Sequence, residues 1–128
     1  MKSLICIDTN IVIRFLQADH PELSAKSREI ILGAESGKYR IYFDEIMIAE
    51  TIWVLTSFYK QDKKEICNLL LKLVSKNWLV NPRKNLILRS LKLCAFANLS
   101  YIDSWIAEVS TANKIKLETF DKDLKKQT

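Results

Sequence analysis

The chain has 128 residues, a length typical of one domain, and a net charge of +5 from 20 Lys and Arg residues against 15 Asp and Glu residues. Its 48% hydrophobic and 27% charged residues are typical of a globular protein and exclude an intrinsically disordered chain. Two glycines and one histidine exclude Gly-rich phosphate-binding loops and His-rich metal sites. We therefore expect a single domain over residues 1–128 whose chemistry depends on carboxylates, hydroxyls, amides and basic side chains.

The three cysteines predict a reducing environment. Cys6, Cys67 and Cys94 are odd in number, widely spaced and embedded in apolar stretches, which is typical of buried free thiols. The apolar run Leu4–Ile7 is too short for the core of a signal peptide or for a membrane helix. We therefore expect a cytoplasmic protein without membrane association.

Short apolar stretches alternate with helical patterns along the chain. The expected strands are Leu4–Ile7, Tyr39–Phe43, Trp78–Val80 and Ile115–Phe120. The expected helices cover Ile11–Leu16, the segment from Pro21 to Gly37, Ile46–Tyr59, a segment opening at Asp62, Leu86–Ala97 and Ser100–Ala112, with a terminal turn at Asp121–Leu124. The first strand is a continuous apolar run, which is typical of a strand buried on both faces. The alternation predicts an α/β domain whose parallel sheet is covered by helices on both sides.

Two acids stand out in the first half of the chain. Asp8 directly follows the first expected strand, at the sheet edge where open α/β folds bind ligands. A helix N-cap is the alternative role for Asp8, and the two roles can coexist. The residues three and four positions away from Glu50 in its helix are all apolar, and a buried glutamate is costly unless it is paired or binds a metal. A buried ion pair or a narrow solvent-facing edge is the alternative for Glu50.

Two more acids stand out near the C-terminus. Asp103 follows Ser100 in the pattern Ser-x-x-Asp, for which helix capping is the alternative role, and Asp121 follows the last expected strand, where a solvated turn is the alternative. If one edge gathers Asp8, Glu50, Asp103 and Asp121, their mutual repulsion favours a hard divalent cation such as Mg²⁺. Such a cation could polarise a phosphodiester and lower the pKa of an attacking water, which suits a nucleic-acid substrate.

Four short motifs, taken in order, resemble those of the PIN-domain nucleases, and within them the single-domain VapC-type toxins of VapBC toxin–antitoxin modules. The matching segments are Ile5–Asn10, Ile48–Thr51, Tyr101–Ala107 and Leu117–Leu124. Each motif is short, but together their order and spacing cover nearly the whole chain. The resemblance implies a three-layer α/β/α sandwich with a central, mainly parallel sheet of about four to five short strands.

The same resemblance implies a metal-dependent endoribonuclease, the toxin of a toxin–antitoxin pair. Asp8 and Asp103 would be direct ligands of Mg²⁺ or Mn²⁺, while Glu50 and Asp121 would complete the cluster directly or through water. A metal-bound water would be the nucleophile. The implied partners are RNA, a cognate antitoxin protein and a second copy in a homodimer.

Residues that support this site are expected around the acids. Asn10 and Thr119 match amide or hydroxyl positions that orient the cluster in the family. Arg14 follows Asp8 in the first helix and could reach a phosphate or pair with an acid. Contacts to the RNA backbone are expected from the following basic residues, for which a merely solvated role is the alternative: Lys60, Lys63, Lys64, Arg83, Lys84, Arg89 and Lys92. The three tryptophans, Trp53, Trp78 and Trp105, are expected to pack in the core.

Other functions stay open on the same residues. A PIN-like nuclease could process RNA without being a toxin, and a catalytically inactive domain of this fold could bind nucleic acid, although all four acidic positions are occupied. A haloacid-dehalogenase-like site needs a second aspartate where Asn10 stands. A receiver domain needs paired acids near the first strand, where only Asp8 is present. The last two alternatives are therefore disfavoured.

Overall fold

Three short parallel strands form the sheet in this computed structural model, which describes residues 3–128. Strands β1 (Ser3–Cys6), β2 (Tyr39–Tyr42) and β3 (Leu79–Val80) lie in the order β1-β2-β3. In the register of the sheet, Ile41 of β2 lies between Ile5 of β1 and Leu79 of β3. The expected parallel sheet is confirmed, but the expectation of four to five strands is wrong for the described residues.

Seven helices are present in the described part of the chain, and most of them begin at a side-chain cap. They are α1 (Thr9–Gln17), α2 (Pro21–Glu35), α3 (Glu45–Ser57), α4 (Lys63–Val74), α5 (Lys84–Phe96), α6 (Tyr101–Ala112) and α7 (Lys122–Lys125), counted over residues 3–128. Six of them begin after a side chain that accepts a backbone N–H of the first turn: Asp8, His20, Asp44, Asp62, Ser100 and Asp121. No helix in this part of the chain is both long and apolar enough to cross a membrane.

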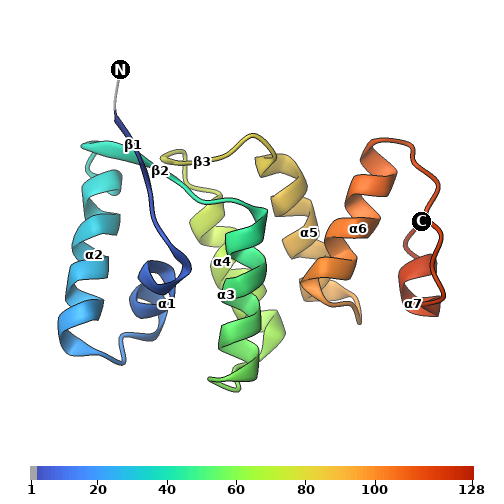
Figure 1. Ribbon diagram of the computed structural model, residues 1–128, viewed down its shortest axis with the longest axis horizontal. Coiled ribbons are helices and arrows are strands. Elements are labelled where there is room, and N and C mark those ends of the chain that lie inside the picture. Colours follow the sequence, from blue (N-terminus) through green and yellow to red (C-terminus); the bar gives the residue numbers. More distant parts are fainter. Residues whose placement is uncertain (1–2) are drawn as a thin grey trace.

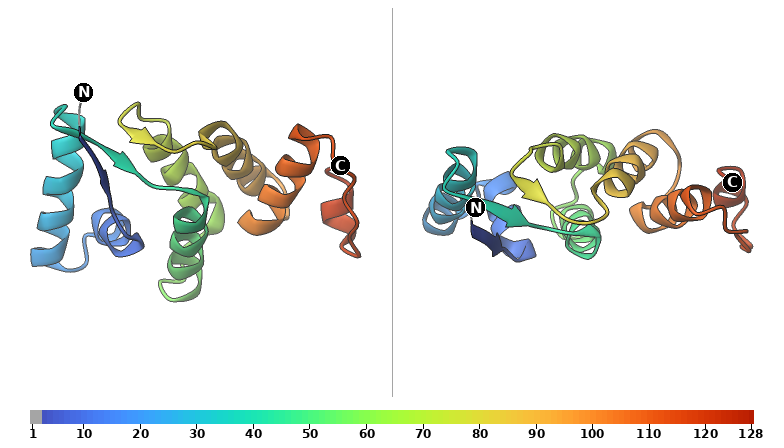
Figure 2. Two further views of the ribbon diagram at one scale, coloured as in Figure 1. Left: turned by 45° about the horizontal axis from the view of Figure 1, so that its top comes forward. Right: turned by 90° about the horizontal axis from the view of Figure 1, so that it is seen from above.

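The molecule is elongated, with two hydrophobic clusters of unequal size. Figures 1 and 2 show α1 and α2 at one end and α6 and α7 at the other, with α3, α4 and α5 between them. The main core surrounds β2 and includes the fully buried side chains of Ile41, Phe43, Ile48, Leu70 and Leu91. A second, small cluster of Leu99, Ala107 and Leu124 joins α6 to α7. The two segments predicted as the first and the last strand, Leu4–Ile7 and Ile115–Phe120, therefore lie far apart within one chain.

The first strand differs from the expectation of burial on both faces. Leu4 is 51% exposed and Cys6 is also exposed, although Ile7 just after β1 is buried. Among the described residues β1 pairs with β2 alone, and the face that carries Leu4 and Cys6 is left uncovered. Cys67 and Cys94 are buried free thiols as predicted, whereas the prediction of burial is wrong for Cys6.

The prediction of a last strand at Ile115–Phe120 is wrong. This segment contains neither helix nor strand, and its two terminal side chains are exposed. Its alternating pattern needs a neighbouring strand edge, and the open edge of β1 lies at the other end of the molecule (Figure 1). A strand pattern therefore does not by itself produce a strand where no partner is in reach.

Helix α3 is less buried than its apolar composition predicts. It buries Ile48, Ile52 and Leu55 in the core but exposes Ile46 and Trp53. The Trp53 ring contacts Phe58 edge to face, with ring centroids 5.7 Å apart. The prediction of core packing holds for Trp78, which is buried, and for Trp105, which packs partly buried against the core, but it is wrong for Trp53.

Replacing Gly33 in α2 tests how tightly that helix packs on β2. The Tyr39 ring lies against Gly33, and its hydroxyl donates a 2.6 Å hydrogen bond to the Ile30 carbonyl. A Cβ at position 33 would overlap this ring. We expect Gly33→Ala to destabilise the protein, because overpacking costs about 1–3 kcal/mol and exceeds the gain of about 1 kcal/mol in helix propensity. Urea unfolding measures the change. The same substitution should stabilise a Tyr39→Leu variant, and a stabilising Gly33→Ala in the natural chain would contradict this packing.

Candidate functional site

The carboxyl edge of the sheet begins at Asp8. This residue follows β1 in an extended conformation, and its Oδ1 accepts the backbone N–H of Ile11 at 3.2 Å. The carboxylate is therefore the N-cap of α1 and is also exposed at the edge where ligands bind in open α/β sheets. The capping alternative is confirmed, and a capped helix N-terminus leaves the second carboxylate oxygen available to a ligand.

The end of β2 places a further acid on the same edge. Asp44 caps α3, with its Oδ1 accepting the N–H of Ile46 at 3.1 Å, and its Oδ2 accepts the Tyr42 hydroxyl at 2.7 Å. This hydrogen bond to Asp44 raises the pKa of Tyr42 above its usual value. Asp44 was not among the predicted site residues, although it has the same signal as Asp8, an acid just after an expected strand.

A partly buried acid, Glu45, directly follows Asp44. Glu45 pairs with Arg83 through Oε2, while its Oε1 is buried without a hydrogen-bond partner among the described residues. The Tyr101 hydroxyl at the start of α6 is likewise buried without a hydrogen-bond partner in residues 3–128. Burial raises the pKa of this hydroxyl. Each unpartnered buried polar atom lowers the stability of the fold by about 1–3 kcal/mol. The Arg83 side chain is thus used for an ion pair within the protein.

Glu50 lies on the exposed face of α3. The expectation that it is surrounded by buried apolar side chains is wrong, because its neighbours Ile46 and Trp53 on the same face are themselves exposed. The solvent-facing alternative therefore describes Glu50 correctly. Being exposed, its carboxylate is available to a cation or to a partner without a desolvation cost.

The two C-terminal acids both lie at helix starts. Asp103 is partly buried in the first turn of α6, where its backbone N–H donates to the Ser100 Oγ at 3.1 Å. Asp121 caps α7, and its Oδ1 accepts the N–H of Asp123 at 2.9 Å. The Asp121 N–H in turn donates to the Thr119 Oγ1 at 3.0 Å, so that Thr119 orients the backbone before Asp121. The Asp121 side chain therefore caps its helix, whereas α6 is capped by Ser100 and not by Asp103.

The structure does not bring the four acids into one cluster. Across residues 3–128, no three Asp, Glu, His or Cys side chains lie close enough together to hold a metal ion. Carboxylate oxygens are the right donors for Mg²⁺ or Mn²⁺, but their arrangement within one chain does not form a complete site for these ions. The roles of Asp8, Glu50, Asp103, Asp121 and the exposed Asn10 stay predictions.

Arg14 pairs with an acid outside this group. Its Nη1 lies 3.1 Å from the Asp19 Oδ1, and Asp19 also accepts the Tyr59 hydroxyl at 3.0 Å. Desolvation works to raise the pKa of Asp19, but the hydrogen bonds from Tyr59 and Arg14 outweigh it and hold this pKa below 3.8. The guanidinium is therefore committed to joining the end of α1 to the segment after α3.

The titration of Asp19 tests this junction. A carboxyl whose pKa is lower in the folded protein stabilises the fold above its unfolded pKa of 3.8, and this contribution is lost as the pH falls through the folded pKa. We expect Tyr59→Phe to raise the pKa of Asp19 towards 3.8, because the variant lacks the hydroxyl donor. Carboxyl-carbon NMR measures both titrations, and an unchanged pKa in the variant would contradict the role of Tyr59.

Several basic side chains expected at the RNA backbone serve the fold instead. The Lys63 Nζ donates to the Leu99 carbonyl at 2.6 Å, the Lys84 Nζ donates to the Leu79 carbonyl at 2.7 Å, and Arg89 pairs with Glu108. Three other members of the expected set have no ion pair within residues 3–128, namely Lys60, Lys64 and Lys92. They are the members of the set available to phosphates.

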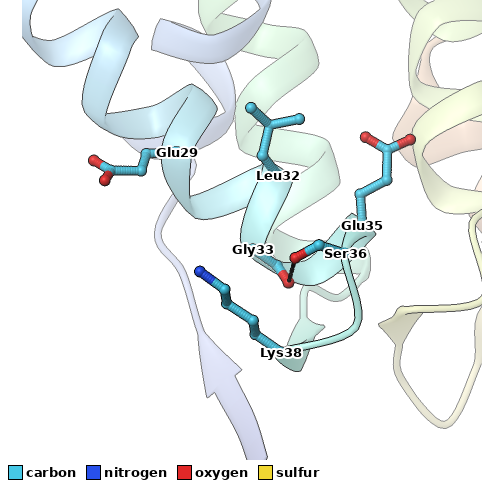
Figure 3. Close-up of a pocket in the computed structure, with 6 residues that line it drawn as sticks. All are labelled: Glu29, Leu32, Gly33, Glu35, Ser36 and Lys38. Atoms are coloured by element: carbon cyan, nitrogen blue, oxygen red, sulfur yellow. Dashed lines mark hydrogen bonds between the residues drawn. The ribbon is translucent and has the colours of Figure 1, made fainter.

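A hollow on the surface lies away from the acids. Figure 3 shows it at the C-terminal end of α2, lined by Glu29, Leu32, Gly33, Glu35, Ser36 and Lys38. The Ser36 hydroxyl is used in the hollow itself, because it donates to the Gly33 carbonyl at 3.1 Å. None of the four acids lines this hollow, so it is not the site that their motifs predict.

Comparison with known protein families gives a match over the part of the chain that contains the four acidic residues. The model of a family described as "PIN domain" matches residues 5–128 of the chain. The comparisons with curated proteins and with solved structures each give no match. The match covers almost the whole chain and includes both the elements at the sheet edge and the C-terminal segment after α6.

Proposed function

Since the chain belongs to the PIN domain family, a nuclease fold that is generally metal-dependent, we propose that it is an endoribonuclease that hydrolyses RNA phosphodiester bonds with Mg²⁺ or Mn²⁺. One observation carries the proposal. Asp8 stands exposed at the carboxyl edge of the sheet, and it belongs to an ordered set of four acids that the family match spans. An exposed carboxylate at this edge can bind a cation without losing its place as a helix cap.

The acids are assigned roles by their motifs. Asp8 and Asp103 are the proposed direct ligands, and Glu50 and Asp121 complete the set directly or through water. When bound, a hard divalent cation offsets carboxylate charge and stabilises negative charge on a phosphate. Because the four acids are not gathered in one chain, we assign no reaction step to them individually. Asn10 and Thr119 are the proposed positioning residues.

A basic surface supports a polyanionic substrate. The chain carries a net charge of +5, and Lys60, Lys64 and Lys92 are available to phosphates. If these side chains contact phosphates, binding should weaken as salt rises, because bound counterions are released from the nucleic acid. The assignment of RNA, as opposed to DNA, rests on the resemblance to the VapC-type toxins.

The biological setting is proposed on the same resemblance. We propose that the protein is a cytoplasmic toxin of a toxin–antitoxin pair, that it forms a homodimer and that a small antitoxin inhibits it. A role in RNA processing without a toxin function is the alternative. A short neighbouring open reading frame that encodes a DNA-binding protein would favour the toxin, and its absence would favour the processing role.

Substrate discrimination tests the proposed activity. End-labelled single-stranded RNA and DNA of the same sequence are incubated with the purified protein in Mn²⁺. We expect internal cleavage of the RNA and no cleavage of the DNA. Asp103→Asn is expected to abolish cleavage, whereas Glu22→Gln, a change of an exposed acid in α2, should leave it unchanged. Equal cleavage of DNA and RNA would refute the RNA specificity, and full activity of Asp103→Asn would refute the site.

A further inference from the structure

The edge of β1 away from β2 is open and has the geometry to pair with a further strand. Its backbone pairs with β2 on one side only, and its other side has no strand partner within residues 3–128. Beside this edge the Leu4 side chain is 51% exposed. An exposed strand edge with apolar side chains is a template for pairing with another segment, because its N–H and C=O groups already have the spacing of a ladder.

The segment Ile115–Phe120 has the complementary properties. Counting partners among residues 3–128, only the Ile115 N–H of this segment donates to a backbone carbonyl, that of Ser110. From Ile115 to Thr119, apolar or β-branched residues alternate with the charged Lys116 and Glu118, and Phe120 ends the alternation. This pattern predicts a half-buried strand, yet in one chain it lacks a neighbour.

Matching the apolar positions gives one parallel register. Ile5 of β1 points to the core side, and placing Leu117 beside it puts Glu118 opposite Cys6. In this register Asp121 falls one position past the level of Asp8, so that both acids lie at the carboxyl edge. Parallel pairing also continues the direction of the two existing strand pairs. Such pairing would bring Asp8 and Asp121, two of the four acids, to the same edge.

The segment that fills the edge comes most simply from another molecule. Within one chain β1 and the segment lie at opposite ends, as both Figures 1 and 2 show. Closing this gap internally would separate α6 from α5, which are joined by the Arg89–Glu108 ion pair and by packing of Leu93 and Ala97 against the cluster that includes Ala107. Docking on a second copy keeps these contacts.

We propose that two copies of this chain exchange their C-terminal segments, so that Ile115–Phe120 of each copy pairs in parallel with β1 of the other. Each exchanged strand brings Asp121 of one copy beside Asp8 of the other. The exchange would form an interface between the two copies whether or not the protein is a nuclease. Its consequence for the active site, an acidic cluster shared between two chains, rests on the proposed nuclease function.

Disulfide trapping tests the exchange without any activity. Cys6 is exposed, and Glu118 is an exposed residue that pairs with Lys116. Under an added oxidant, Glu118→Cys should give a covalent dimer on a non-reducing gel, because the two sulfurs face each other across the paired strands. Lys116→Cys, displaced along the strand, should give much less dimer. Removing Cys6 in the double variant Cys6→Ser, Glu118→Cys should abolish it.

Three outcomes of the trapping experiment would overturn the proposal. A cross-linked monomer that migrates faster than the reduced chain would show that the segment pairs within its own molecule. A dimer that persists without Cys6 would show contact between two C-terminal segments, and no dimer at all would show that the edge stays open.

Mixing two inactive variants tests the shared site. Asp8→Asn and Asp121→Asn are unfolded together and refolded. A shared site predicts about one quarter of the wild-type rate of RNA cleavage, because half of the dimers are mixed and each of these has one intact site. If the wild type cleaves RNA but the refolded mixture does not, the shared site is refuted. If the wild type itself is inactive, the proposed function fails, and disulfide trapping still decides the exchange.

Discussion

Asp8→Asn is expected to lower the rate of metal-dependent RNA cleavage by about 100-fold or more, since loss of a metal ligand costs at least as much as loss of the groups that support one. Asparagine caps helices as well as aspartate does, so that the hydrogen bond to the Ile11 N–H can persist. What the variant loses is the negative charge at the sheet edge. Gel-based cleavage rates measure the effect, with thermal unfolding as the measure of the fold.

Asp62→Asn is the matched control for this variant. Asp62 is also exposed and caps α4 through a 3.1 Å hydrogen bond from the Glu65 N–H, but it lies outside the family's acidic motifs. The two variants make the same chemical change at the same kind of position. We expect Asp62→Asn to keep the wild-type rate, and an equal loss in both variants would mean that capping, not metal binding, explains the role of Asp8.

Phe43→Ala is expected to cost about 3–5 kcal/mol, a large part of the 5–15 kcal/mol by which a domain of this size is stable. Phe43 is fully buried directly after β2, and its carbonyl accepts the Asn81 Nδ2 at 3.0 Å. Removing the ring leaves a cavity in the main core. We therefore expect a lower urea midpoint.

Phe96→Ala is the comparison for the core variant. Phe96 ends α5 and its side chain is 84% exposed, so that the same change of side chain removes little buried surface. We expect its free energy of unfolding to lie within about 1 kcal/mol of the natural chain. Similar losses at both positions would contradict the placement of the core around β2.

Local signals in the sequence predicted the elements well. Side chains such as Asp62 and Ser100 mark helix starts because they satisfy backbone N–H groups within a few residues, and the structure confirms both caps. The short apolar run before Asp8 likewise predicted a strand at the correct place. These features depend on nearby residues, so a single sequence contains the information for them.

Neighbours in space could not be predicted in the same way. The run Leu4–Ile7 has the composition of a strand buried on both faces, yet its exposure depends on whether another part of the chain covers the second face. Glu50 was expected among buried side chains because Ile46 and Trp53 are apolar, but all three share an exposed face of α3. Apolar composition predicts helix formation, whereas burial depends on packing partners distant in the sequence.

The candidate site shows the same difference between local features, which the sequence predicts, and contacts between distant residues, which it does not. The motifs identified each acid, and the structure places Asp8 and Asp121 at helix starts where their caps are local. Whether such acids meet depends on the pairing of Ile115–Phe120, which requires a strand edge supplied from elsewhere. An exchange between copies would be invisible in the sequence of one chain, because identical motifs describe both arrangements.

The dependence of RNA cleavage on divalent metal tests the central claim most directly. The initial rate is measured on protein treated with EDTA, before and after Mg²⁺ or Mn²⁺ is restored in excess. We predict no cleavage without metal, recovery with either metal, and no recovery in Asp8→Asn. Cleavage in EDTA at the full rate, unchanged in Asp8→Asn, would contradict a metal-dependent nuclease built on these carboxylates.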